Sequence, residues 1–230
     1  METLGHYIRS IYAQFNASEK DYWLKKLKST YDLNVQLTPG VHNGFWIIRE
    51  ICQIFKPIPP ELVKACGVKT LNLRDDMGPN KPYYPNHGYF INQEVTLNSD
   101  IFHHPDKPDD FVDFRGYFLT RPQQTIIHEL GHGFDFHHSD LSTQPAWLKL
   151  SGWSQQPGPG LERLHIKDKG VPEILGEWYF DSKSEFTRFY AQRNPWDDWA
   201  DSFSFYVAGL RNKVPSKKAG YFSNLLRAYY

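Results

Sequence analysis

Apolar side chains recur with a helical period in two segments near the start of the chain. Residues 7–30 predict a helix in which Ser18 could cap the apolar turn that follows it. Residues 43–56 predict a second helix, and Pro57 would end it because proline lacks the next backbone N–H donor. The N-terminal part of the chain is therefore expected to be helical.

Two later segments have the length and composition of strands. Residues 68–73 predict a short strand, and residues 89–98 predict a longer one. Residues 75–88, between them, are rich in Pro, Asn and Gly and predict a loop. Residues 139–172 contain the run SGWSQQPGPG and are also expected to be loop-like.

Helical periodicity returns at Thr120 and extends to His137. Thr120 can cap this helix, and Pro122 is tolerated in its first turn because the N–H that proline lacks has no partner there. Residues 182–192 and 195–210 predict two further helices, the second with a proline in its first turn.

This order of elements is neither a regular βαβ series nor all-β, so it predicts an α+β fold. A length of 230 residues fits one domain, residues 1–230. We expect a helical part at 1–60, strands and a central helix at 61–138, and a C-terminal part at 139–230. Hydrophobic residues make up 40% of the chain, which is enough for a packed core.

Charge and composition argue against several classes of protein. The formal net charge is zero, so there is no overall positive field to attract nucleic acid. No run approaches the ~18 apolar residues of a membrane span, and the N-terminus lacks the apolar core of a signal peptide. We therefore expect a soluble chain without an export signal. Cys52 and Cys66 could form a disulfide or remain buried thiols.

The sequence HELGH, at residues 128–132, is an HExxH motif on the predicted central helix. Residues four apart share one face of a helix, so His128 and His132 can bind the same Zn²⁺. Glu129 lies beside them and can act as the general base that activates a zinc-bound water. A helix with two ordinary histidines is the alternative interpretation.

A catalytic zinc site usually has a third protein ligand. His138 has the spacing of the metzincin pattern HExxHxxGxxH, but Asp135 stands where that pattern needs glycine for a sharp turn. Asp197 is the other candidate, at the start of the predicted helix 195–210. Asp201 lies four residues further on and could accept the free ring N–H of a ligand histidine. Asp198 is expected only to stabilise the helix N-terminus.

HELGHGFD, followed by a helix with an acidic residue and then Ala-Asp-x-Phe, resembles the catalytic domain of anthrax lethal factor and the related Pro-Pro endopeptidases. The resemblance covers about residues 120–137 and 188–205. It implies a zincin-like metalloprotease domain with a small mixed sheet, one catalytic Zn²⁺ and a peptide or protein substrate. It assigns the third ligand to Asp197 and a catalytic hydrogen bond to Tyr190, seven residues earlier.

The chain departs from this family in two respects. The family uses glutamate as third ligand, and aspartate is one methylene shorter, so the second helix must come closer to the metal. The separation of 65 positions from His132 to Asp197 also exceeds the one expected for the family, which an insertion near 139–180 would explain. Glu173, Glu177 and Glu185 therefore remain rival third ligands.

These features predict a zinc-dependent endopeptidase. A metzincin-like protease that uses His138, or an inactive zincin-fold binding module, remains open, although an intact Glu129 argues against the latter. By resemblance, the strand 89–98 would form one wall of the cleft and pair with extended substrate. The resemblance to secreted toxins and endopeptidases also suggests export or delivery into another cell.

Overall fold

A computed structural model describes residues 2–41, 44–75, 88–103, 119–162 and 178–230. Within them lie a four-stranded sheet, a smaller three-stranded sheet and helices packed around both, so the chain is a mixed α and β protein. The predicted loop 75–88 falls almost entirely outside the described residues. No described helix carries an apolar stretch long enough to traverse a lipid bilayer.

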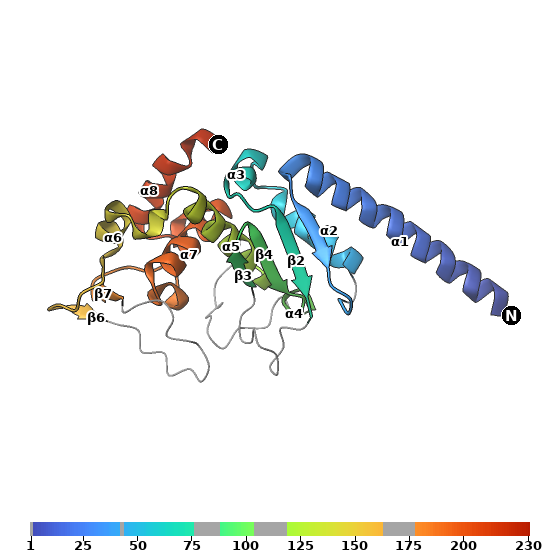
Figure 1. Cartoon of the computed structure of the whole chain (residues 1–230), viewed down its shortest axis with the longest axis horizontal. Coiled ribbons are helices and arrows are strands. Elements are labelled where there is room, and N and C mark those ends of the chain that lie inside the picture. Colours follow the sequence, from blue (N-terminus) through green and yellow to red (C-terminus); the bar gives the residue numbers. More distant parts are fainter. Residues whose placement is uncertain (1, 42–43, 76–87, 104–118, 163–177) are drawn as a thin grey trace.

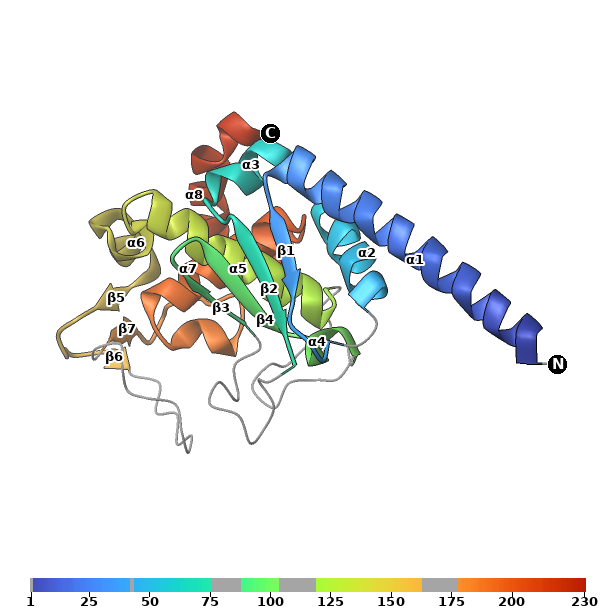
Figure 2. The same cartoon turned by 45° about the vertical axis from the view of Figure 1, so that its right-hand side comes forward.

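Two helices account for most of the N-terminal part. Helix α1, Glu2–Tyr31, is one continuous helix, and Figures 1 and 2 show its N-terminal half extending away from the rest of the chain. The prediction that Ser18 caps a helix is therefore wrong, because Ser18 lies inside α1. Helix α2, Gly44–Phe55, confirms the second prediction and ends before Pro57.

The larger sheet has the strand order β1-β2-β4-β3. Strand β1, Asn34–Leu37, was not predicted, whereas β2, Thr70–Arg74, corresponds to the predicted strand 68–73. Strands β1, β2 and β4 run parallel, and β3 is antiparallel to β4, so the small mixed sheet is confirmed. A short helix, α3 at Pro60–Ala65, precedes β2, and another, α4 at Asp100–His103, follows β4.

The predicted single strand 89–98 is instead a hairpin. Strand β3 is Gly88–Ile91 and strand β4 is Glu94–Asn98. The two residues between them, Asn92 and Gln93, have φ values of +50° and +68°. Positive φ at both central positions belongs to the tight turn whose twist matches paired strands. Asn-Gln lacks the glycine that usually marks this turn, so the two strands were predicted as one.

Helix α5, Arg121–His137, lies between the sheet and the C-terminal helices. It packs against β3 and β4 on one side and against α7, Pro195–Val207, on the other, as Figure 2 shows. Apolar side chains from the sheet, α2, α5 and α7 join in one buried core. Helix α5, which carries the HExxH motif, is thus packed between the sheet and α7.

The C-terminal part has more regular structure than the sequence predicted. The segment 139–162, expected to be loop, contains the turn η1 (Leu141–Thr143), the helix α6 (Pro145–Ser151) and the strands β5 (Trp153–Ser154) and β6 (Leu161–Glu162). Pro145 begins α6 and Gly152 ends it with a left-handed conformation, φ +77°. Strand β7, Tyr179–Asp181, completes the smaller sheet.

The predicted helix 182–192 is wrong over most of its length. Only Phe189–Gln192 is helical, as the 3-10 turn η2. Helix α7 confirms the next prediction, with Pro195 in its first turn. The turn η3 (Arg211–Lys213), the helix α8 (Ser216–Leu225) and the turn η4 (Arg227–Tyr229) follow, and none of these was predicted.

Candidate metal centre

Helix α5 presents both histidines of the HExxH motif on one face. The hydroxyl of Thr120 accepts from the backbone N–H of Gln123, whose side chain accepts from the backbone N–H of Thr120. This capping box confirms the predicted start of the helix. The Nε2 atoms of His128 and His132, one turn apart, lie 3.0 Å from each other. Local sequence therefore sets the position of two of the candidate ligands.

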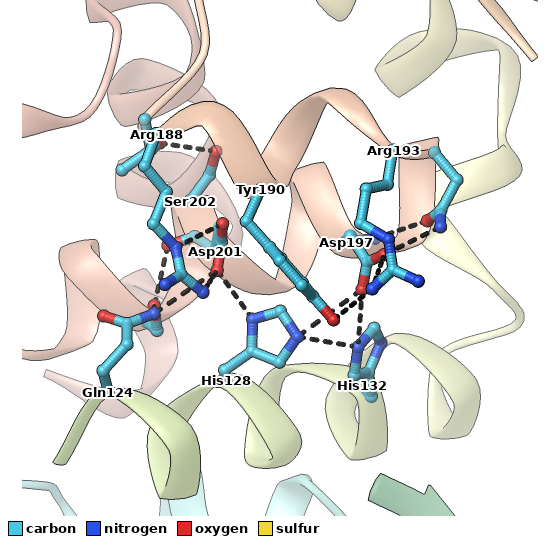
Figure 3. Close-up of polar contacts among 12 residues, drawn as sticks. Gln124, His128, His132, Arg188, Tyr190, Arg193, Asp197, Asp201 and Ser202 are labelled. Carbon is cyan, nitrogen blue, oxygen red and sulfur yellow. Dashed lines mark hydrogen bonds and ion pairs between the residues drawn. The ribbon is translucent and has the colours of Figure 1, made fainter. Parts of the chain in front are cut away.

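The start of α7 brings a carboxylate to the two imidazoles. Oδ1 of Asp197 lies 3.6 Å from Nε2 of His128 and 3.5 Å from Nε2 of His132, and Figure 3 shows the three side chains converging. Four ligands arranged tetrahedrally around zinc, with bonds of ~2.0–2.1 Å, have donor atoms about 3.3–3.4 Å apart. The observed separations fit that geometry, and these three residues form a group that could hold a metal ion.

The N-cap of α7 leaves one oxygen of Asp197 available. Asn194 accepts from the backbone N–H of Asp197 and donates its side-chain amide to Oδ2 of the same residue, at 2.8 Å. Oδ1 faces the histidines. Burial alone would raise the pKa of this carboxyl, but the neighbouring His128 and His132 and the charge of Arg193 outweigh burial and hold the pKa far below its usual range. The site therefore favours positive charge next to Oδ1.

Helix α5 packs closely on α7, and this brings Asp197 to the two histidines. A Cβ atom added to Gly131 would lie 3.0 Å from the Cα of Ala200. Gly131, next to His132, therefore lies against the backbone of Ala200, which is one turn after Asp197. This short distance between the helices lets the short side chain of Asp197 reach the two histidines.

Asp201 orients His128, as the spacing of the two aspartates predicted. Its Oδ1 lies 2.7 Å from Nδ1 of His128. An ionised carboxylate can only accept, so Nδ1 carries a proton and Nε2 is the ring nitrogen that faces the centre. Arg188 donates to both oxygens of Asp201, at 2.6 and 2.7 Å, and Gln124 donates to Oδ1. Although burial lowers the pKa of His128, the neighbouring aspartates raise it to about 9.

Asp201→Asn should weaken zinc binding by about 10- to 100-fold because His128 would lose its fixed tautomer and orientation. Competition with a chelator of known affinity would measure the change. Asp100→Asn, an exposed carboxylate outside the site, is the control and should not alter zinc affinity. Equal affinity in the two variants would contradict an orienting role for Asp201.

Glu129 is buried next to the two histidines and, with them, lines a hollow in the protein surface. Its Oε2 atom is buried without a hydrogen-bond partner among the described residues. Burial raises the pKa of its carboxyl, and the positive charge of His128 and His132 partly opposes that rise. A buried carboxylate of raised pKa that faces a hollow has the properties of a general base.

Tyr190, on η2, also reaches the centre. Its ring lies 5.7 Å from the ring of His128, centroid to centroid, in an edge-on arrangement. Burial, together with the charge of Asp197, raises the pKa of its hydroxyl well above the usual value, so the hydroxyl stays protonated. Tyr190 and Asp197 thus lie at one site, although the helix predicted around Tyr190 is a single 3-10 turn.

The rival third ligands differ from Asp197 in their placement. The metzincin pattern needs a sharp turn at the position of Asp135, but helix α5 continues through this residue. His138 is the C-cap of the helix. The ring of His138 stacks on Phe134 at 3.9 Å and donates from Nδ1 to the Phe134 carbonyl. Glu185 is exposed and is not part of the group of candidate ligands among the described residues. Glu173 and Glu177 lie outside the described residues.

The expectation that Asp198 serves only the helix N-terminus is wrong. Asp198 is fully buried and pairs with Lys218 of α8 at 2.5 Å. It also accepts from the indole N–H of Trp153 at 3.0 Å. The Lys218 ammonium lies 4.6 Å from the ring of Phe186 and 5.6 Å from that of Trp147. The residue next to the candidate ligand Asp197 is therefore anchored to the C-terminal helix.

A hollow of about 480 Å³ gives access to the centre. The edge strand β3, the helix α5 and residues of the segment 190–197 line this hollow. Arg193 and Trp196 line this hollow and were not predicted. Asn194, the N-cap of α7, also lines the hollow. An asparagine directly before a proline is a recognisable N-cap pattern, whereas no local pattern indicates Arg193.

Cys52 and Cys66 lie away from this site and are free, buried thiols.

No family model matches this chain, and no curated protein does so either. Among solved structures, a candidate zinc-binding metallopeptidase from Bacteroides caccae is similar to it, with 14% identity and a TM-score of 0.42. The match covers 91% of this chain and 77% of that chain. Similarity at this level says nothing about activity, so function must be argued from the residues of the site.

Proposed function

We propose that this protein is a zinc-dependent endopeptidase. The observation that carries the proposal is the convergence of His128, His132 and Asp197, with donor atoms 3.0 to 3.6 Å apart, beside a buried carboxylate. In this proposal the three residues hold one Zn²⁺. The ion would supply a water of pKa near ~7 and would polarise the scissile carbonyl.

The residues of the chain have separate tasks in this mechanism. Glu129 takes the proton of the attacking water and later passes it to the leaving amine; its Oε2 has no competing partner among the described residues. Tyr190 donates its hydroxyl hydrogen to the oxyanion that develops on the carbonyl oxygen. Asp201 holds His128 in the tautomer that leaves Nε2 free to bind metal.

We place the substrate along β3. Residues Gly88–Ile91 line the hollow over the whole length of the strand, and β3 is the outermost strand of the described sheet. An extended peptide laid against it would bring a main-chain carbonyl between Glu129 and Tyr190. This placement favours internal peptide bonds, because the segment of substrate along β3 continues on both sides of the cleaved bond.

Two histidines and a carboxylate also form the ligand set of non-haem iron enzymes. The free carboxylate of Glu129 favours hydrolysis, because a proton acceptor beside the metal is what activation of water requires. Metal analysis distinguishes the two: the proposal requires zinc, and iron with no peptide cleavage would contradict it.

The test is metal content per chain in protein purified without chelator. We expect near one zinc in the wild type, loss of zinc in Asp197→Ala, and retention in His138→Ala. Wild type and variants would also be tested for cleavage of an internally quenched random-peptide library. Loss of zinc in His138→Ala but not in Asp197→Ala would assign the chain to the metzincin-like alternative. A folded wild type that binds no zinc after its addition would remove the basis for the proposal.

A further inference from the structure

Two arginines flank Tyr190, and they have different partners. The guanidinium carbon of Arg188 lies 5.0 Å from the centre of the Tyr190 ring, and that of Arg193 lies 4.6 Å from it. Arg188 uses its donors on Asp201. Arg193 instead donates from Nη1 to the hydroxyl oxygen of Tyr190, and Figure 3 shows it on the Asp197 side of the tyrosine.

The same nitrogen of Arg193 lies next to a second oxygen. Nη1 is 3.6 Å from Oδ2 of Asp197, so it stands between a phenol and a carboxylate. A phenol donates readily to a carboxylate, and that bond would consume the only proton of the hydroxyl. Nη1 of Arg193 is thus within reach of both oxygens and competes with Asp197 for contact with the Tyr190 hydroxyl.

The direction of the hydrogen bond follows from the donor inventory. A guanidinium has donors and no acceptor, so the Tyr190 oxygen must accept from Arg193. The hydroxyl hydrogen of Tyr190 therefore remains available for another acceptor. Hydrogen bonds in series polarise one another, so accepting from a cation makes the phenol a stronger donor.

We propose that Arg193 is a positioning residue that keeps the Tyr190 hydroxyl hydrogen directed at the substrate and away from Asp197. This inference rests on the proposed peptidase function. Arg193 need not touch the substrate, because it acts through Tyr190. Its loss should then affect the chemical step as the loss of the Tyr190 hydroxyl does, and it should leave zinc binding and substrate binding nearly unchanged.

The experiment is a double-mutant cycle with Arg193→Met and Tyr190→Phe, measured as kcat and KM on the peptide best cleaved from the quenched library. Each single variant should lower kcat by a similar factor, up to about 100-fold, with KM within about twofold. The double variant should be no slower than Tyr190→Phe alone. Arg193→Lys keeps a donor and should recover part of kcat.

Arg211→Met is a matched control, since Arg211 is an exposed arginine stacked on Tyr206 at the same 4.6 Å. It should leave kcat unchanged, and zinc content should be near one in every variant. Multiplicative losses in the double variant, or loss of zinc in Arg193→Met, would overturn the role of Arg193 while the peptidase function stands. A zinc-loaded wild type that cleaves no peptide would overturn both.

Discussion

Glu129→Gln should lower peptide hydrolysis by about 10²- to 10⁴-fold while zinc stays bound. Glutamine has the shape of glutamate but cannot take up a proton at neutral pH, so only the transfer of the proton from the attacking water is lost. His128, His132 and Asp197 are unchanged in this variant, and Glu129 donates no hydrogen bond to any of them. Initial rates on the quenched peptide, with zinc quantified in the same samples, would measure the effect.

The structure also predicts how this variant behaves as a folded protein. Oε2 of Glu129 is buried with no partner among the described residues, and burial raises the pKa of the carboxyl. A neutral amide loses less hydration on burial than a carboxylate, so stability should not fall. Thermal unfolding at equal zinc content would check this and separate loss of chemistry from loss of fold.

Glu185→Gln is the control for Glu129→Gln. Glu185 is an exposed carboxylate and does not line the hollow, so its loss should change neither rate nor zinc content. Near wild-type activity in Glu129→Gln would show that another group accepts the proton, and Glu129 would then lose its assigned role. Loss of zinc in Glu185→Gln would instead make Glu185 a candidate for the third zinc ligand.

The sequence was sufficient wherever a signal is local. Thr120, Gln123 and Pro122 mark the start of α5 within a few residues of one another, and the helical spacing of His128 and His132 guarantees that they share a face. The same holds within α7, where Asp197 and Asp201 are one turn apart. Each of these predictions needs only the geometry of one helix.

The meeting of the two helices could not be predicted from such signals. It depends on Gly131 and Ala200, whose small size permits contact between α5 and α7. Both residues lie in the segments quoted for the resemblance, but their small size does not by itself indicate that the two helices meet. The way that helices pack together is a property of the whole fold. The sequence therefore supplied Asp197 as one of several candidates, and the arrangement in space separates it from His138 and Glu185.

The wrong helix prediction at 182–192 arose where side chains compete with the helix for backbone partners. In the segment 182–188, Asp181 accepts from the backbone N–H of Lys183, and Ser184 donates to the carbonyl of Ser151. Such bonds stabilise turns in place of a helix. They involve residues up to 33 positions apart, so the helical periodicity of this segment was misleading.

Lys218→Met should destabilise the fold by about 3–5 kcal/mol, because it would leave the Asp198 carboxylate buried without its cation. Lys218 and Asp198 are both almost fully buried and lie 2.5 Å apart, so neither can turn to water. Methionine fills a similar volume, so the loss arises from charge more than from packing. Chemical denaturation of metal-free protein, monitored by tryptophan fluorescence, would measure the free energy of unfolding.

Lys217→Met is the matched control, since Lys217 is the exposed neighbour on the same helix. Its stability should stay within about 0.5 kcal/mol of the wild type. A similar decrease in the free energy of unfolding in both variants would mean that α8 itself is weakened. The buried Lys218–Asp198 pair would then not be the cause. The double variant Asp198→Leu with Lys218→Met should recover much of the loss, less the cost of the unpartnered Trp153 N–H.

The pH dependence of Lys218→Met gives the charge argument a second test. Burial already raises the pKa of Asp198, and in the wild type the charge of Lys218 opposes that rise. Without Lys218 the folded state should bind the proton of Asp198 more tightly than the unfolded state does. A group whose pKa is raised by folding stabilises the protein at low pH, and that contribution is lost as pH rises. The destabilisation should therefore be smaller at about pH 5 than at about pH 8, and a loss independent of pH would indicate a packing defect.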